Sequence, residues 1–256
     1  MEYLENGNIY NEDCRTGIGK IRSSSVDLLV TEPPYPANFQ ELPLTTICHS
    51  RIQPSRYAFT SAEDYQDFSI KWLHEVWRAM SPSASGFIFS HWRNLRFLLN
   101  AVNNVRLRLV NHIIWRHPVS NRDEIAQKRF VPSHFHILYI TKLPLKKDKS
   151  RIFHRIPEYS SSKGKLYFED VWNHSQLSTN HEINLPIFPS LIEKCIRIAS
   201  NEEDLVLDPF LTSYGLLKFC LRHNRTFIGF TNSERDYKMM QQQVSRRNPD
   251  YPVDNS

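Results

Sequence analysis

Short apolar runs alternate along the chain with longer segments whose apolar residues recur every three or four positions. The clearest short run, residues 26–31, stops at a double proline and is typical of a buried strand. Runs of the same character occupy residues 8–14, 86–89, 107–115, 135–140, 204–208 and 226–230. Helical spacing is found at residues 61–80, 94–102, 191–198, 213–222 and 233–244. This alternation predicts an α/β fold with a doubly wound, mostly parallel, seven-stranded sheet.

The composition changes this picture little. With 256 residues, of which 40% are hydrophobic and 23% charged, the chain suffices for one large soluble domain, predicted to span residues 1–256. No apolar run is long enough to cross a membrane, and the first residues lack a signal-peptide pattern, so a cytoplasmic location is expected. The net charge of +5 is compatible with a polyanionic partner such as DNA without establishing one.

Cysteine and histidine spacing does not favour a metal site. The four cysteines lie far apart without a CxxC pair: Cys14, Cys48, Cys195 and Cys220. Four histidines are candidate ligands or bases: His91, His117, His134 and His136. Their surroundings favour core or surface positions instead.

Candidate chemistry gathers where the strand at 26–31 ends, in the sequence Glu32-Pro33-Pro34-Tyr35. The carboxyl ends of parallel strands form the ligand-binding edge of an open α/β sheet. Proline fixes φ and has no N–H, so the carbonyls here are held in place and can accept hydrogen bonds. A carboxylate, a carbonyl and an aromatic ring together suit an exocyclic amino group on a flat heterocycle. An ordinary Pro-Pro turn is the alternative interpretation.

A second strand–loop–helix segment lies at residues 205–216 and contains Asp208-Pro209-Phe210. Such a turn can hold a nucleotide-like cofactor at the start of its helix, although alone it is a weak signal.

Together the two segments resemble the class β amino-methyltransferases of DNA, in which the catalytic motif precedes the cofactor motif. The family's (D/N/S)PP(Y/F/W) motif corresponds to Glu32-Pro33-Pro34-Tyr35, and its DPFxGSGTT motif to residues 208–216. Further similarities lie at residues 11–14, 113–115, 188–191 and 225–229. The resemblance implies a circularly permuted, Rossmann-like fold and methylation of adenine N6 or cytosine N4 by S-adenosylmethionine.

The resemblance also implies roles for individual residues. Glu32 and the Pro33 carbonyl would accept hydrogen bonds from the target amine. Pro34 belongs to the same catalytic motif, and Tyr35 would stack on a flipped base. The residues expected at the cofactor are Asp13, Cys14, Phe188, Pro189, Asp208, Phe210, Thr212, Ser213 and Thr231.

A basic insertion at about residues 142–180 resembles a small target-recognition region, and a polar tail follows at 246–256. The cationic residues expected to contact DNA are Lys146, Lys147, Lys149, Arg151, Arg155, Lys163 and Lys165. A solvated surface is the alternative reading of such a charge run.

Several positions depart from the family pattern. Glu32 is one methylene longer than the family's aspartate, Thr212 and Tyr214 replace two glycines, and Thr231 stands where an acid would bind the ribose. A β-branched residue resists the positive φ that glycine allows, and a tyrosine ring takes up space needed by a ligand.

These departures favour a catalytically degenerate subunit that binds DNA or supports an active methyltransferase partner, with no cofactor of its own. A divergent but active S-adenosylmethionine-dependent enzyme and a plain DNA-binding module are the alternatives. Class β relatives commonly dimerise, so the resemblance also implies an oligomer.

Overall fold

The computed structural model describes residues 3–5, 7–34, 57, 59–116, 133–142, 150–159, 168–173, 189–211 and 215–247. Its first part contains β1 (Asn8–Asn11), α1 (Cys14–Gly17), the 3₁₀ helix η1 (Ile18–Lys20), β2 (Val26–Thr31), α2 (Ala62–Ala79), β3 (Met80–Ser90) and α3 (Trp92–Asn104). The middle part contains β4 (Arg108–Arg116), β5 (His134–Thr141), the 3₁₀ helix η6 (Pro157–Tyr159) and β6 (Val171–Asn173). The last part contains α4 (Pro189–Ala199), β7 (Leu205–Asp208), α5 (Gly215–Arg222), β8 (Thr226–Thr231) and α6 (Glu234–Arg247).

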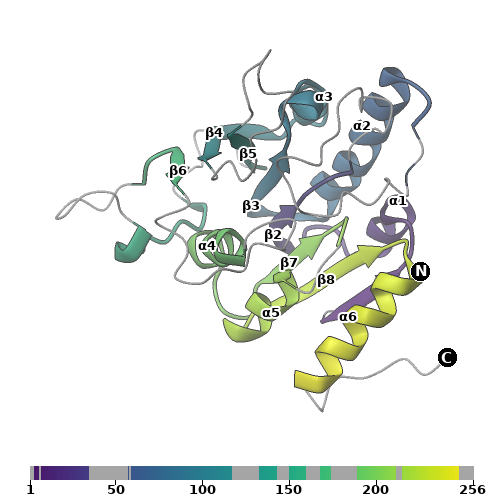
Figure 1. Cartoon of the computed structure of the whole chain (residues 1–256), viewed down its shortest axis with the longest axis vertical. Coiled ribbons are helices and arrows are strands. Elements are labelled where there is room, and N and C mark those ends of the chain that lie inside the picture. Colours follow the sequence, from purple (N-terminus) through teal and green to yellow (C-terminus); the bar gives the residue numbers. More distant parts are fainter. Residues whose placement is uncertain are drawn as a thin grey trace, which may run out of the picture.

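The described strands form one sheet in the order β1-β8-β7-β2-β3-β5-β4-β6 (Figure 1). Only β5 runs antiparallel to its neighbours, so the predicted mostly parallel sheet is confirmed. The sheet has eight described strands, whereas the sequence predicted seven. The strand that was not predicted, β6, pairs along one side with β4. It is only three residues long, which is too short to give a periodic signal.

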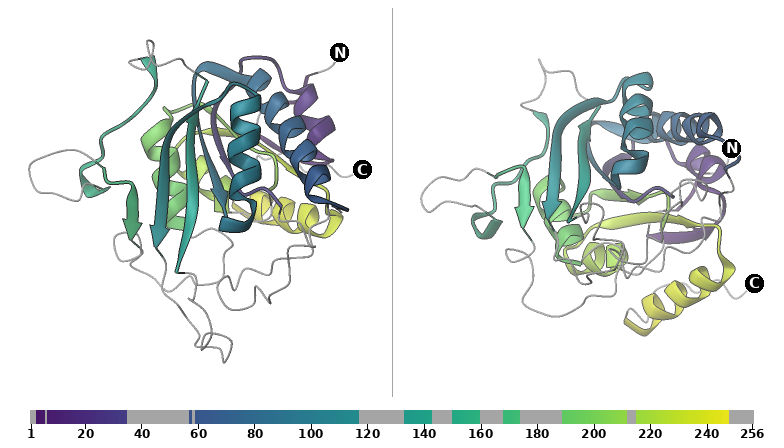
Figure 2. Two further views of the ribbon diagram at one scale, coloured as in Figure 1. Left: turned by 90° about the horizontal axis from the view of Figure 1, so that it is seen from above. Right: turned by 45° about the horizontal axis from the view of Figure 1, so that its top comes forward.

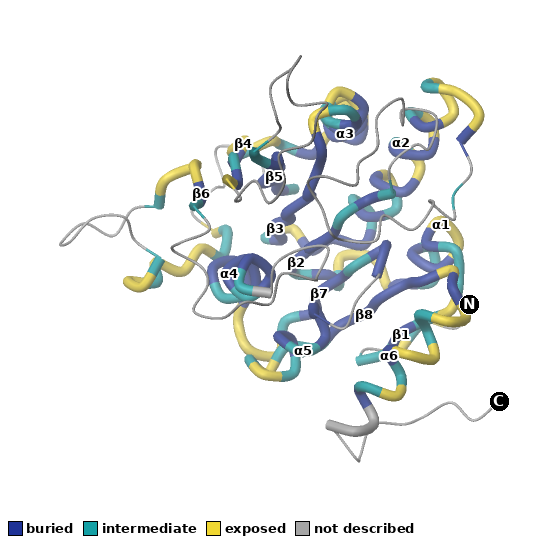
Figure 3. Tube along the Cα trace, viewed as in Figure 1, coloured by how far each residue is buried: buried dark blue, intermediate teal, exposed yellow. Residues whose placement is uncertain are grey.

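Helices cover both faces of the sheet, as a doubly wound fold requires (Figure 2). Alternate side chains of β2 enter different cores: Leu29 packs with α1, α2 and α3, whereas Leu28 and Val30 pack with α4, α5 and α6. Successive residues of a strand point to opposite faces, so a continuous apolar run becomes a strand buried on both sides. The central strands are accordingly buried along their length, and exposed residues gather on the outer helices (Figure 3).

Helix α2 shows why its sequence pattern was informative. The Ser61 hydroxyl accepts a hydrogen bond from the Asp64 N–H, which caps the first turn. The apolar residues at helical spacing, including Tyr65, Phe68 and Trp72, are buried, so the core interpretation of these aromatic rings is confirmed. The helix ends at Ala79, one residue earlier than predicted, and β3 begins at Met80 without an intervening loop.

Helix α6 ends later than predicted, because it continues to Arg247 and so includes the first residues assigned to the polar tail. Within the described residues, no helix has the length and apolarity needed to cross a membrane.

Gly17 lets α1 lie directly on β8. A Cβ atom at this position would stand 2.2 Å from Cε1 of Phe230, far inside van der Waals contact. We therefore expect Gly17→Ala to lower the free energy of unfolding by about 1–3 kcal/mol through overpacking, although alanine is the better helix former. Urea denaturation measures this loss.

The matched control is Gly19→Ala in the adjoining turn, where the nearest neighbour of a Cβ would be Oε2 of Glu75 at 4.0 Å. Its expected effect is below about 0.5 kcal/mol. Equal losses in the two variants would contradict the packing argument.

Candidate active site

The parallel strands β1, β8, β7, β2 and β3 end at one edge of the sheet. Asn11 is level with Thr231, Asp208 with Gly229, and Thr31 with Ile88. Asp208 and Thr231 are the last residues of their strands, while Glu32 and Asp13 follow theirs within two residues. Four predicted site positions, from segments far apart in the sequence, therefore come to the same edge, where open α/β sheets bind their ligands.

The Glu-Pro-Pro segment continues β2 beyond its last paired residue. Pro33 is buried, whereas Glu32 and Pro34 are half-buried. The segment therefore lies at the edge of the sheet and stays partly exposed. Tyr35 lies outside the described residues. The structure thus brings three of the four predicted catalytic residues to the edge, on the strand that neighbours Asp208.

Asp208 is linked to β2 through its carboxylate. Oδ1 accepts a hydrogen bond of 2.6 Å from the Thr31 hydroxyl and one of 3.0 Å from the Phe210 N–H. Burial raises the pKa of Asp208 to about 6, although these two hydrogen bonds act in the opposite direction. Thr31 was not singled out from the sequence, and its position just before Glu32 was the only available signal.

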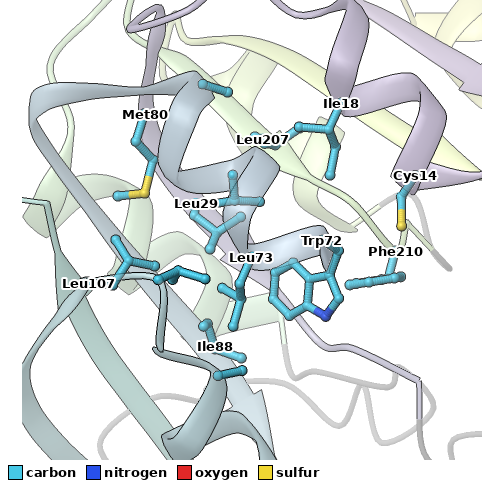
Figure 4. Packing of buried hydrophobic residues seen from close by; sticks show 14 of the residues in the cluster. Cys14, Ile18, Leu29, Trp72, Leu73, Met80, Ile88, Leu107, Leu207 and Phe210 are labelled. Carbon is cyan, nitrogen blue, oxygen red and sulfur yellow. The ribbon is translucent and has the colours of Figure 1, made fainter. Parts of the chain in front are cut away.

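The ring of Phe210 packs in a cluster of aromatic side chains. Its centroid lies 5.1 Å from that of Trp72, 5.8 Å from Tyr57 and 5.9 Å from Phe68. Trp72 and Phe210 lie side by side in the core, with Cys14 above Phe210 in the view of Figure 4.

This packing anchors the loop after β7. The Leu211 N–H donates to the Phe230 carbonyl at 2.8 Å, which fixes the loop against β8 as well. Because Phe210 is only 7% exposed, it contributes to the edge chiefly by holding Asp208 in place. Thr212, Ser213 and Tyr214 lie outside the described residues.

Asp13 and Cys14 mark the start of α1. Asp13 caps this helix, and its carboxylate accepts a bidentate pair of hydrogen bonds from the Arg15 guanidinium, with nitrogen–oxygen distances of 3.0 and 2.7 Å. Partial burial opposes ionisation, but the hydrogen bonds from Arg15 hold the pKa of Asp13 below its ordinary value. Burial raises the pKa of the Cys14 thiol to about 12, which leaves it a neutral packing group.

The end of β8 carries no carboxylate, because Thr231 occupies that position and is buried. A carboxylate lies close by in α6, however. The Asn11 side-chain amide donates to Oε2 of Glu234 at 2.5 Å, joining the end of β1 to the start of α6. Glu234 also pairs with Lys238 at 3.0 Å. Neither Asn11 nor Glu234 was predicted from the sequence as a cofactor contact.

The described part of the basic insertion contacts α4 and β5. The His154 N–H donates to the Ile198 carbonyl at 2.7 Å, near the last residue of α4. From there the chain leads to the start of β7. Arg151 donates to the Tyr139 hydroxyl and stacks on the Tyr139 ring, while Arg155 is exposed. These contacts place Arg151 on β5 and leave Arg155 at the surface.

The other predicted DNA contacts lie outside the described residues: Lys146, Lys147, Lys149, Lys163 and Lys165. Phe188 does so too, and Pro189 is described only as the first residue of α4.

His112, His134 and His136 form a packed group on β4 and β5. His91 caps α3, and His117 lies outside the described residues. The His112 and His136 rings are joined by a nitrogen–nitrogen contact of 2.8 Å. Burial first, and the neighbouring His112 and His134 next, lower the pKa of His136 to about 4, so its ring is neutral at pH 7. Among the described residues no cluster of histidine, cysteine and acidic side chains is arranged to hold a metal ion.

Comparison with known proteins agrees with this arrangement. The N6_N4_Mtase family profile, described as DNA methylase, matches residues 26–242. The type II methyltransferase M.BamHI of Bacillus amyloliquefaciens is 24% identical over 98% of this chain and 63% of its own length. For M.HpaI of Haemophilus parainfluenzae the identity is 27%, over 88% of this chain and 69% of the relative. The chain thus spans roughly two thirds of these curated relatives.

Solved structures share the fold. The PvuII DNA methyltransferase (cytosine-N4-specific) gives a TM-score of 0.70 at 16% identity and covers 100% of this chain and 89% of its own. A putative DNA modification methylase from Thermus thermophilus, complexed with S-adenosyl-L-methionine, gives 0.65 at 19% identity, with 97% and 98% of the two chains covered. The match of the family profile over most of the sequence confirms the resemblance of the motifs: the chain belongs to the N6/N4 DNA amino-methyltransferase family.

Proposed function

We propose that this protein binds S-adenosylmethionine and DNA and methylates the exocyclic amine of adenine or cytosine. The observation that carries the proposal is the pairing of β2 with β7, which sets Glu32 and Asp208 on neighbouring strands at one edge. A target amine at Glu32 and a methyl donor at Asp208 would then be adjacent, which is the geometry that direct transfer requires.

The described residues offer a suitable place for the cofactor along β1, β8 and β7. Asp208 presents a carboxylate for the ammonium of the methionine portion, and Asn11 with Glu234 presents hydrogen-bonding groups for a ribose. When bound, S-adenosylmethionine supplies an electrophilic methyl group on sulfur.

Residues of this chain prepare the amine for attack. The Glu32 carboxylate and the Pro33 carbonyl accept its two N–H bonds, which orients the nitrogen lone pair toward the methyl group. Because the lost proton needs an acceptor, a carboxylate at this position serves the reaction better than an amide. Stacking on Tyr35 would hold the base once it is out of the duplex.

The second candidate is a non-catalytic subunit that binds DNA or supports an active methyltransferase partner. Thr212 and Tyr214 in place of two family glycines favour it, since a side chain larger than glycine at these positions would reduce the room for a cofactor. The oligomer, the partner subunit and the cytoplasmic location are predictions from the sequence that belong with this proposal.

Titration calorimetry with S-adenosylhomocysteine, together with methyl transfer to DNA from labelled S-adenosylmethionine, separates the two candidates. We expect the wild-type chain to bind the ligand, and Tyr214→Gly to tighten binding by about tenfold as the ring is removed. Transfer by the isolated chain supports the enzyme. Absence of both binding and transfer, with restored binding in Tyr214→Gly, would establish the non-catalytic subunit instead.

A further inference from the structure

The edge beyond Glu32 carries an exposed tryptophan. Trp92 is the first residue of α3, follows the end of β3, and is 55% exposed. Thr31 is level with Ile88 in the parallel pair of β2 and β3. Trp92 and the Glu-Pro-Pro segment therefore follow neighbouring strands at the same edge of the sheet.

Cationic side chains continue from Trp92 along the same edge. The Arg93 guanidinium lies 5.3 Å from the Trp92 ring centroid. Ser90 pairs with His136, so the start of β5 at His134 comes level with the end of β3, and His134 in turn pairs with Arg116 at the end of β4. Arg116 is exposed.

The face defined by Trp92, Arg93 and Arg116 therefore spans β3, β5 and β4, on the side of Glu32 opposite the proposed cofactor strands.

This combination of groups suits a nucleic-acid strand. An exposed aromatic ring can stack on a base or sugar, and guanidinium groups bind phosphates with two hydrogen bonds. One strand of a duplex advances ~3.4 Å along the helix axis per nucleotide, so an edge of ~10 Å from β3 to β4 gives room for a few nucleotides.

Resting on the proposed function, we propose that the Trp92–Arg93–Arg116 face binds the DNA strand that carries the target base. Trp92 stacks on the nucleotide next to the extruded base, and Arg93 and Arg116 bind the phosphates that follow. The strand then runs away from the cofactor, so neither ligand blocks the other. This places the DNA at the edge formed by the ends of β3 and β4 and the start of β5.

Fluorescence anisotropy of a labelled DNA duplex, with the full chain at several salt concentrations, tests the proposal. Trp92→Ala is expected to weaken binding about 5- to 100-fold with an unchanged slope against log salt. Arg116→Gln is expected to weaken binding and flatten that slope by about 1, because one phosphate contact is lost. Trp92→Phe, which keeps a ring, should restore much of the affinity.

Matched controls come from a second exposed aromatic residue with a cation beside it: Tyr3 is 49% exposed, and the Arg22 guanidinium lies 5.1 Å from its ring centroid. Tyr3→Ala and Arg22→Gln are expected to leave DNA affinity unchanged. Larger losses in these two variants than in Trp92→Ala and Arg116→Gln would overturn the proposal.

Calorimetric binding of S-adenosylhomocysteine shows that each variant is folded and distinguishes failure of this face from failure of the proposed function. Unchanged DNA affinity in Trp92→Ala, with cofactor and DNA binding by the wild type intact, refutes this face alone. A wild-type chain that binds no DNA refutes the proposed function and this face with it.

Discussion

Replacing Glu32 with aspartate is expected to raise the rate of DNA methylation about 10- to 100-fold. The Glu32 side chain follows β2 at the edge of the sheet and is one methylene longer than the aspartate of the family motif. A displacement of about 1 Å at a reacting group can cost about a hundredfold in rate. Single-turnover transfer from labelled S-adenosylmethionine measures the change, because it separates chemistry from product release.

Glu32→Ala is the matched control, and its rate should fall at least about 100-fold below that of the wild type as the acceptor for the amine is lost. Affinity for S-adenosylhomocysteine should stay within about twofold in both variants, since Glu32 is assigned to the amine and not to the cofactor. A slower Glu32→Asp variant would show that the longer side chain is fitted to this site. Equal rates in all three proteins would remove Glu32 from the mechanism.

The position of the candidate site could be predicted because its residues follow apolar runs. A strand such as residues 26–31 is recognised from local sequence, and parallel pairing then sends its end to the same edge as Asp208. The contact between Thr31 and Asp208 could not be predicted, because it joins residues 177 positions apart and depends on the sheet order. The packing of Phe210 on Trp72 could not be predicted either, because helical periodicity identified Trp72 only as a core residue.

The role of the basic run in DNA binding stays a prediction, because most of its cations lie outside the described residues. Among the described ones, Arg151 donates to the Tyr139 hydroxyl, a contact that the charge run did not indicate. Arg93 and Arg116 come to the edge from separate elements and are not part of any charge run. A surface assembled from the ends of β3 and β4 has no compositional signature, so only the fold reveals it.

Asp208→Asn is expected to stabilise the protein while weakening cofactor binding. Burial raises the pKa of this carboxyl to about 6, so the folded state disfavours the charge that the group carries at pH 8. The asparagine Oδ1 can still accept from the Thr31 hydroxyl and the Phe210 N–H, and the charge is removed. We expect the free energy of unfolding at pH 8 to rise by about 1–2 kcal/mol, measured by urea denaturation.

The pH dependence identifies the cause. The pKa of an unfolded aspartate is about 3.9, so between about pH 4 and pH 6 the folded wild type binds more protons than the unfolded chain, and its stability falls as pH rises. The advantage of Asp208→Asn should therefore be small near pH 4 and reach its full size above about pH 7. An advantage that is equal at pH 4 and pH 8 would contradict a titrating origin, and a loss at pH 8 would mean that the carboxylate is stabilising.

Cofactor affinity is expected to change in the opposite direction. If Asp208 binds the ammonium of the methionine portion, its loss removes a charge-assisted hydrogen bond and should weaken S-adenosylhomocysteine binding about tenfold or more. Thr31→Val serves as the control, since it removes one hydrogen bond to Oδ1 and keeps the charge. It should lower stability by about 1 kcal/mol with a smaller effect on the ligand. A carboxylate that costs stability but is needed for binding is what a functional site at this edge requires, because a purely structural residue would gain nothing from the charge.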